Sequence, residues 1–182
     1  MERLEELLKH ARDGAAPVEQ WDPPYCGDIG LEIAADGSWS YQGSEVRRLA
    51  MVKLFARVLR RDADGRTYLV TPAEKVDVAV ADAPFLAVGM EVQGEGETQS
   101  LLFRTNVDDV VRCGPDHPMR FADGGADAPF KPYVHVRGRL DALVSRALVY
   151  DLVALAVPRA APGAKEEAFG IWSDGAFFAF PG

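Results

Sequence analysis

Residues 43–62, with the sequence GSEVRRLAMVKLFARVLRRD, are the stretch from which we derive the fold. No Pro or Gly interrupts the stretch after its first residue, so the pattern predicts one long helix with Ser44 as its N-cap. Asp64-Gly65 then predicts a turn. Arg66–Val80 predicts two short strands broken at Thr71–Lys75. This helix followed by a hairpin is the unit around which the rest of the chain is interpreted.

Upstream of the helix, Ile29, Leu31 and Ile33 alternate with small or polar residues, which predicts a half-buried strand. Asp36-Gly37 predicts a tight turn into a partner strand at Ser38–Tyr41. Downstream, the pattern predicts strands at Phe85–Val92, Ser100–Phe103, Val110–Cys113, Met119–Phe121 and Tyr133–Val136, a second long helix over Arg139–Val157, and a final hairpin of Ala168–Trp172 and Ala176–Phe180.

These elements predict an α+β fold of two halves, each a curved antiparallel sheet packed on one long helix. We expect an N-terminal helix and linker over residues 1–20, a first half over 21–97 and a second half over 98–182. Aligning Val46 with Leu140 and Leu54 with Leu148 matches the apolar positions of the two predicted helices. Any two amphipathic helices can be matched in this way, so the pattern alone leaves an internal duplication open.

Composition favours a cytoplasmic protein. The chain has 182 residues, is 48% hydrophobic and carries a net charge of −8. No apolar run approaches the roughly 20 residues that a membrane span needs, and the acidic N-terminus lacks the apolar core of a secretory signal. Cys26 and Cys113 are the only cysteines, and so few thiols fit a reducing compartment. The sequence leaves open the alternative that these two form one disulfide. We expect no membrane partner.

Six cations crowd the long predicted helix: Arg47, Arg48, Lys53, Arg57, Arg60 and Arg61. They fit either a solvated face of an acidic protein or a patch for an anion or an acidic partner. No P-loop, Gly-x-Ser-x-Gly elbow or Gly-x-Gly-x-x-Gly run occurs in the sequence. The three histidines and two cysteines lack metal-ligand spacing. We therefore expect neither a metal nor a cofactor.

Two polar stretches, Thr71–Lys75 and Arg104–Asp109, directly follow apolar strands, and they supply the candidate site residues. One explanation is local: Thr71 and Asn106 cap turns, while Lys75 or Arg104 pairs with Asp108 or Asp109. The other is a polar pocket in which Lys75 and Arg104 bind an anionic group. The candidate ligand-binding residues are Thr71, Glu74, Lys75, Arg104, Thr105, Asn106 and Asp108. The sequence leaves both explanations open, and it identifies no catalytic residue.

Several motifs in combination resemble a family of short bacterial proteins of unknown function. The motifs include Trp21-Asp22-Pro23, Cys26-Gly27-Asp28-Ile29, Asp36-Gly37-Ser38-Trp39, Tyr68–Lys75, Phe103–Asp108, Tyr133–Arg137 and Trp172-Ser173-Asp174-Gly175. The resemblance implies an α+β fold with two similar halves, the second loosely like a pleckstrin-homology barrel. It also implies a ligand or partner role in signalling, with no established activity.

We therefore expect a binding protein with a regulatory role, which recognises a small anionic ligand or a protein partner at the junction of the two halves. The alternative is a hydrolase-like enzyme that uses a polar cleft at the same junction. An enzyme would need a titratable group with a perturbed pKa in a deep cleft. Trp39 and Trp172 lie in apolar strands beside turns, and we expect both to be largely buried.

The net charge of −8 predicts no appreciable affinity for DNA or RNA at physiological salt, because such binding draws largely on the release of counterions by a basic surface. A gel-shift titration checks this expectation. Micromolar binding that weakens steeply as salt is added would contradict it.

Overall fold

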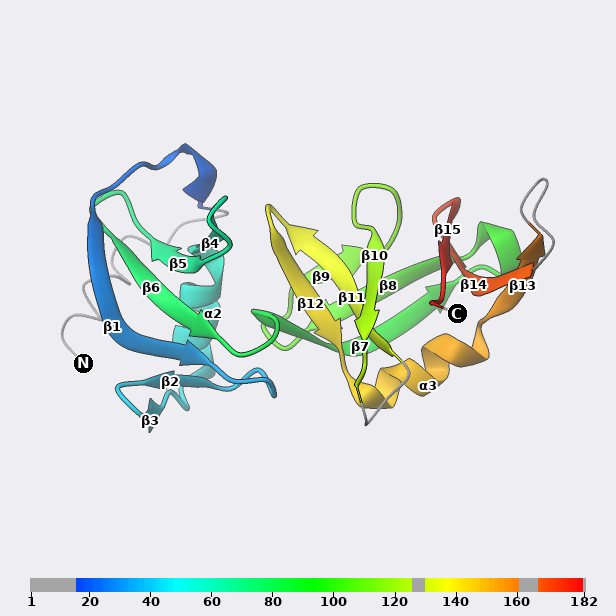
Figure 1. The fold of residues 1–182 in the computed structure, drawn as a ribbon, viewed down its shortest axis with the longest axis horizontal. Coiled ribbons are helices and arrows are strands. Elements are labelled where there is room, and N and C mark those ends of the chain that lie inside the picture. The colour runs from blue at the N-terminus through cyan, green and yellow to red at the C-terminus, as the bar shows by residue number, and fades with distance from the viewer. Residues whose placement is uncertain (1–15, 126–129, 161–166, 182) are drawn as a thin grey trace. The chain divides into compact units, whose positions relative to one another are not determined.

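The structure, a computed structural model, describes residues 16–125, 130–160 and 167–181. The expected helix at 1–11 lies outside these residues. The fold is mixed α+β and mostly strands, with two six-stranded sheets, one short helix beside each, and a small three-stranded sheet (Figure 1). By its internal contacts the chain divides into two units, 1–84 with 138–140 and 85–137 with 141–182.

The first unit holds one mixed sheet of six strands in the order β3-β2-β1-β6-β5-β4. β1 and β6 pair in parallel at its centre, and the other neighbours are antiparallel. Its elements are η1 (Val18–Gln20), β1 (Tyr25–Ile33), β2 (Trp39–Tyr41), β3 (Ser44–Glu45), α2 (Leu49–Arg57), β4 (Leu59–Arg61), β5 (Thr67–Val70) and β6 (Lys75–Val80). The antiparallel sheet that we expected is therefore mixed in this unit.

The predicted hairpin at the start of this sheet is confirmed. Ile33 of β1 lies opposite Trp39 of β2, across a turn in which Gly37 has a φ of 81°. That conformation is open to glycine at little cost, which explains the Asp-Gly pair. Trp39 is buried, as expected, and its ring stacks on that of Phe55 in α2, with the centroids 5.9 Å apart. This contact fixes α2 against the core face of the sheet.

The long helix predicted over 44–62 is wrong at both ends. Ser44 and Glu45 form β3 and pair with β2, so Ser44 is not an N-cap. The helix ends at Arg57, and the next residues form β4, where Leu59 pairs with Leu69 of β5. Both leucines are fully buried. Sheet pairing across the core thus outweighs the local helical preference of these residues.

The second unit holds a mixed sheet in the order β10-β11-β12-β7-β8-β9, in which β7 and β12 are parallel. Its elements are β7 (Phe85–Gln93), η2 (Gly96–Thr98), β8 (Ser100–Thr105), β9 (Val110–Arg112), β10 (Met119–Asp123), β11 (Phe130–Arg137), β12 (Leu140–Val144), α3 (Arg146–Ala154), β13 (Val157–Ala160), β14 (Glu167–Ser173) and β15 (Ala176–Ala179). The expected boundary between residues 97 and 98 falls within η2, between β7 and β8, whereas the division into units falls after Pro84.

The second long helix, predicted over Arg139–Val157, is also wrong. Its first part is strand β12, in which Leu140, Ala142 and Val144 are buried and alternate with more exposed residues. The helix α3 begins only at Arg146. Across the described part of the chain, no helix is long and apolar enough to cross a bilayer.

The two six-stranded sheets share one strand order. In each, the first three strands lie on one side of the centre, the next three lie on the other, and the sixth runs parallel to the first. The helices do not correspond, because α2 connects the third strand to the fourth whereas α3 follows the sixth. Matching the two helices therefore aligned elements that occupy different places in the two units.

The three-stranded sheet β13-β14-β15 contains the predicted final hairpin, which is confirmed, with Asp174 and Gly175 both at positive φ in its turn. β14 and β15 approach closely at Gly170. A Cβ atom there would lie 2.3 Å from the carbonyl oxygen of Phe178 and 2.8 Å from the Cα of Ala179. Trp172 is less buried than Trp39 and stays partly exposed.

The close approach at Gly170 yields a stability prediction. Gly170→Ala should cost about 1–3 kcal/mol, because backbone atoms cannot yield to the added methyl group. A thermal melt should show a fall of about 2–4 °C per kcal/mol in Tm. Gly89→Ala is the matched control in a strand, since its Cβ would meet the movable Arg104 side chain at 3.3 Å. Equal Tm values for the two variants would contradict the close packing of β14 on β15.

Candidate functional site

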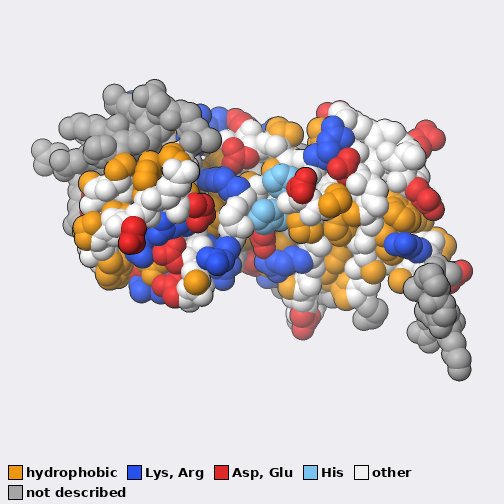
Figure 2. Space-filling model, turned by 90° about the horizontal axis from the view of Figure 1, so that it is seen from above, with side chains coloured by type: hydrophobic (Ala, Val, Ile, Leu, Met, Phe, Trp, Pro, Cys, Tyr) orange, Lys and Arg blue, Asp and Glu red, His pale blue; other side chains and the backbone are white. Residues whose placement is uncertain are grey.

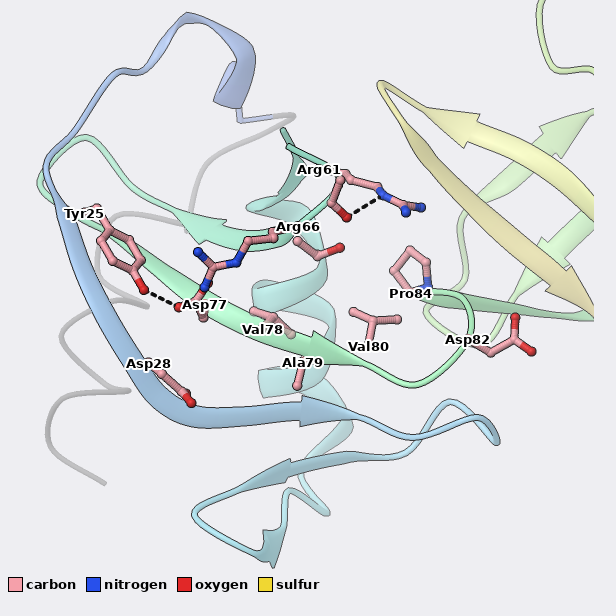
Figure 3. Close-up of a pocket in the computed structure, with 12 residues that line it drawn as sticks. Tyr25, Asp28, Arg61, Arg66, Asp77, Val78, Ala79, Val80, Asp82 and Pro84 are labelled. Carbon is pink, nitrogen blue, oxygen red and sulfur yellow. Dashed lines mark hydrogen bonds and ion pairs between the residues drawn. The ribbon is translucent and has the colours of Figure 1, made fainter. Parts of the chain in front are cut away.

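A cavity of about 540 Å³ lies over one face of the sheet of the first unit. Tyr25 and Asp28 reach it from β1, Asp77 from β6, Arg61 from the end of β4, and Arg66 from the residue before β5. Figure 3 shows the side chains of this group, with α2 behind the strands in the same view. The cavity is thus on the opposite side of the sheet from the helix-covered core.

Asp77 is the centre of the polar contacts in this cavity. Its Oδ1 accepts a hydrogen bond from Nη2 of Arg66 at 2.5 Å, and its Oδ2 accepts one from the hydroxyl of Tyr25. The Asp77 side chain is only 12% exposed, whereas that of Arg66 is 55% exposed. The carboxylate therefore anchors an arginine whose side chain is more than half exposed.

Two tyrosine rings hold the Arg66 guanidinium in place. Its central carbon lies 5.8 Å from the ring centroid of Tyr25 and 5.5 Å from that of Tyr68, which are cation–π distances. The Tyr25 side chain, followed by the charge of Asp77, raises the pKa of Arg66 above its ordinary value. Arg66 is consequently a fixed and permanent positive charge at the cavity.

β1 is irregular where it contributes to the cavity. Its pairing with β6 shifts register between Tyr25 and Asp28 and again between Asp28 and Leu31. Gly27 and Gly30 have φ values of 86° and 77°, and Asp28 Oδ1 accepts a hydrogen bond from the Gly30 backbone at 2.7 Å. Such bulges turn side chains towards a chosen face and often lie beside functional sites. They explain how Tyr25 and Asp28, three residues apart, line the same cavity.

A second ionic cluster of the first unit joins Arg60, Asp62 and Lys75. Arg60 is 8% exposed and donates to the carbonyls of Val18 and Trp21, at 2.7 Å each, and through Nε to Asp62 at 2.6 Å. Lys75 Nζ lies 2.9 Å from the other oxygen of Asp62. Arg60 therefore ties the segment before β1 to the sheet. We had expected it on a basic helix face, but it lies in strand β4.

The resolved pKa shifts around this face all favour fixed charge states. Burial alone would raise the pKa of Asp62, but hydrogen bonds from Arg60 and Lys75 lower it. The hydroxyl of Tyr68 donates to Asp64 at 2.6 Å, which raises the pKa of Tyr68 to about 12 and lowers that of Asp64. Each of these shifts moves the pKa of a group further from 7, so none of them prepares a proton donor or acceptor that works at pH 7.

Among the candidate residues from the sequence, Thr71 and Glu74 lie in the turn between β5 and β6. Thr71 Oγ1 accepts hydrogen bonds from the backbone of Ala73 at 3.3 Å and of Glu74 at 3.1 Å. Its own N–H donates to the Glu74 carbonyl at 2.9 Å. Thr71 thus acts as a turn cap, which is the local alternative. Lys75, the next candidate, pairs with Asp62 and lies 4.4 Å from the ring centroid of Tyr68.

Thr105 and Asn106 organise the turn after β8 in the second unit. Thr105 Oγ1 accepts from the backbone of Val107 at 3.3 Å and of Asp109 at 3.1 Å. Asn106 exchanges hydrogen bonds with the backbone of Leu86, donating through its own N–H at 2.8 Å and accepting at Oδ1 at 3.1 Å. Both side chains therefore have the structural roles of the local alternative.

Arg104 and Asp108 form a more exposed ion pair at 3.4 Å, with side chains 53% and 55% exposed. Such pairs contribute roughly 0–1 kcal/mol to stability. Lys75 belongs to the first unit and Arg104 to the second, so the structure joins Lys75 with Asp62 and Arg104 with Asp108 within separate units. The convergence of Lys75 and Arg104 at a junction stays a prediction.

Sequence reasoning included Arg61 in the predicted basic helix but did not select Tyr25, Arg66 or Asp77. Asp77 stands between Val76 and Val78 in a strand, and a carboxylate in that position is a signal for a buried ion pair. Its partners, Tyr25 and Arg66, come from two other strands or their ends. The pairing of β6 with β1 on one side and with β5 on the other brings them together, and no local motif shows the β1–β6 pairing.

Comparison with known proteins agrees with the resemblance found in the sequence. Residues 16–83 match the N-terminal domain of a family described as "Domain of unknown function (DUF1285)", and residues 84–180 match its C-terminal domain. The chain belongs to the DUF1285 family. No curated protein matches it. The boundary between the two DUF1285 domains coincides, within one residue, with the division into units.

Two solved structures resemble this DUF1285 protein. A DUF1285 family protein from Silicibacter pomeroyi DSS-3 is 46% identical, with a TM-score of 0.84 over 95% of this chain and 93% of that chain. A DUF1285 family protein from Shewanella baltica OS155 is 28% identical, with a TM-score of 0.55 over 69% of this chain and 91% of that chain. These likenesses support the fold and the family and name no activity.

The buried Arg60–Asp62 pair and the exposed Arg104–Asp108 pair differ in burial, and this difference gives a stability prediction. Arg60→Ala should cost roughly 3–5 kcal/mol, because it leaves two carbonyls without their donor and removes one of the two cations that pair with the mostly buried Asp62. Arg104→Ala, the matched control, removes the same side chain from an exposed pair and should change stability by less than about 1 kcal/mol. Chemical denaturation of both variants measures this difference. A larger loss for Arg104→Ala would mean that its ion pair is not the exposed one described.

Proposed function

We propose that this DUF1285 protein is a binding protein, and that the cavity of its first unit takes a small ligand with one anionic group. The observation that carries the proposal is Arg66, which is fixed by Asp77 and two tyrosine rings yet remains more than half exposed at the cavity. Arg66 donates to Asp77 through Nη2, and with five N–H groups on a side chain that is 55% exposed it keeps donors for a ligand. A planar guanidinium of this kind suits a carboxylate or a phosphate.

The other charged side chains of the cavity indicate which further chemical groups the ligand carries. Arg61 is exposed and donates through Nε to the Gly65 carbonyl at 3.0 Å, which leaves its charge without a carboxylate partner in the described part of the chain. Asp28 and Asp82 line the same cavity. A ligand that is purely anionic would be repelled by these carboxylates, so we infer that it also carries O–H or N–H donors.

Binding is better supported than catalysis. The pKa shifts of Asp62, Asp64, Arg66 and Tyr68 all lead away from neutrality, whereas an acid–base catalyst needs a pKa near the working pH. These groups also hold one another in stable pairs. The enzyme alternative from the sequence therefore rests on no observation of this face.

Three finer expectations stand as proposals. The shared strand order of the two sheets supports an internal duplication, with sheets and not helices as the repeated part. Six strands followed by one helix support a loose likeness of the second unit to a pleckstrin-homology barrel. A regulatory or signalling role, a protein partner, and a site at the junction of the halves remain inferences from the sequence and its resemblance.

Adenosine monophosphate is a suitable probe, because it combines a phosphate, hydroxyl donors and a base that can stack on the half-exposed Tyr25 ring. Isothermal titration of the full chain should show binding of adenosine monophosphate and weaker binding of adenosine and of inorganic phosphate. Arg66→Gln should weaken the binding of adenosine monophosphate about 10- to 100-fold, which is the usual contribution of a hydrogen bond to a charged group.

Arg47→Gln is the matched control, since it removes an exposed arginine of the same unit that pairs with Glu45. It should leave the affinity unchanged. No binding of any of the three probes, or equal losses in the two variants, would contradict the proposal. Release of inorganic phosphate from adenosine monophosphate, lost in Arg66→Gln, would instead support the enzyme.

A further inference from the structure

A second cavity, of about 380 Å³, lies in the second unit and has a different character. Its walls include the side chains of Val92 from β7, Leu155 after α3, Val157 from β13 and Trp172 from β14. Glu95 is the one charged residue that lines it among the residues described. Figure 2 shows hydrophobic side chains gathered at the end of this unit formed by β13–β15, on the right of the view. The volume is that of a small-molecule site.

Trp172 forms a rigid wall of this cavity. The guanidinium carbon of Arg159 lies 4.7 Å from its ring centroid, and the Phe177 ring lies 5.3 Å away at an interplanar angle of 61°. These two neighbours fix the orientation of the indole, although the residue stays partly exposed. An aromatic surface that is already ordered loses little entropy when a ligand packs against it.

Gln99 supplies the polar group of the cavity. It is 5% exposed and lines the cavity, and its Nε2 donates to the Trp172 carbonyl at 2.9 Å. A primary amide side chain also has an acceptor oxygen. Within the described ranges, no donor contacts Gln99 Oε1. Gln99 thus offers an acceptor oxygen, on a side chain fixed by its Nε2 hydrogen bond, at a cavity with mostly apolar walls.

We propose that this cavity binds a small, neutral, planar aromatic molecule with one N–H or O–H donor, of the indole or phenol class. The ring packs against Trp172 and the aliphatic walls, and the donor reaches Oε1 of Gln99. Glu95 at the cavity disfavours an anionic ligand. This site lies in the second unit and is independent of the anion site proposed on the first.

Isothermal titration of the full chain with indole tests the proposal. 1-Methylindole is the matched probe, because it keeps the ring and lacks the N–H donor. The proposal predicts that indole binds and that 1-methylindole binds about five- to tenfold more weakly, as expected for the loss of one hydrogen bond. Equal affinities, or no indole binding up to its solubility limit, would overturn it.

A pair of tryptophan substitutions locates the site. Val92→Trp fills the cavity from a residue that is 40% exposed, so the fold should tolerate it, and indole binding should be lost. Val110→Trp places the same side chain on β9, at a residue that is 61% exposed and does not line the cavity. It should bind indole like the unaltered protein. Indole binding that survives Val92→Trp in a folded protein would show that the site is elsewhere.

Discussion

The parallel pairing of β1 with β6 is the interaction on which the first unit depends. These two strands lie at the centre of the sheet and set its register. One face then carries the buried Leu31, Val76 and Val78, and the other carries Asp77 with its partners. Because neighbouring side chains point to opposite faces, a slip of one residue would bury Asp77 in the core and expose the valines. Core and cavity are therefore specified by the same pairing.

The polar face shows how similar ion pairs serve different purposes. The cluster around Arg60 is nearly buried, and its hydrogen bonds to Val18 and Trp21 hold the chain to the sheet. Breaking the ion pairs of this cluster to bind a ligand would leave a buried charge without a partner. Arg66 is more than half exposed, and a ligand can join its contact with Asp77 at little cost. This difference in exposure, rather than the number of charges, assigns the binding role to Arg66.

Local patterns predicted the strands and hairpins well and the helices poorly. Asp36-Gly37 and Ser173-Asp174-Gly175 mark turns because a positive φ is needed there, and this requirement is visible in the sequence. Leu59 and Leu140 looked helical, because their neighbours are apolar at helical spacing. Their place in strands depends on partners elsewhere in the sheet, which spacing does not reveal. The predicted turn residues, such as Thr71, proved to be caps. The cavity escaped prediction because Tyr25 and Asp77 are 52 residues apart.

The second unit repeats the strand order around β7 and β12 but carries an aromatic, nearly uncharged cavity. One strand arrangement thus supports two surfaces of different chemistry. A crystal structure of the protein with adenosine monophosphate tests the central claim, the role of Arg66, most directly. The account predicts a phosphate oxygen about 2.7–2.9 Å from the Arg66 guanidinium, with the base against the Tyr25 ring. A nucleotide bound elsewhere, with only solvent beside Arg66 and Asp77, would contradict it.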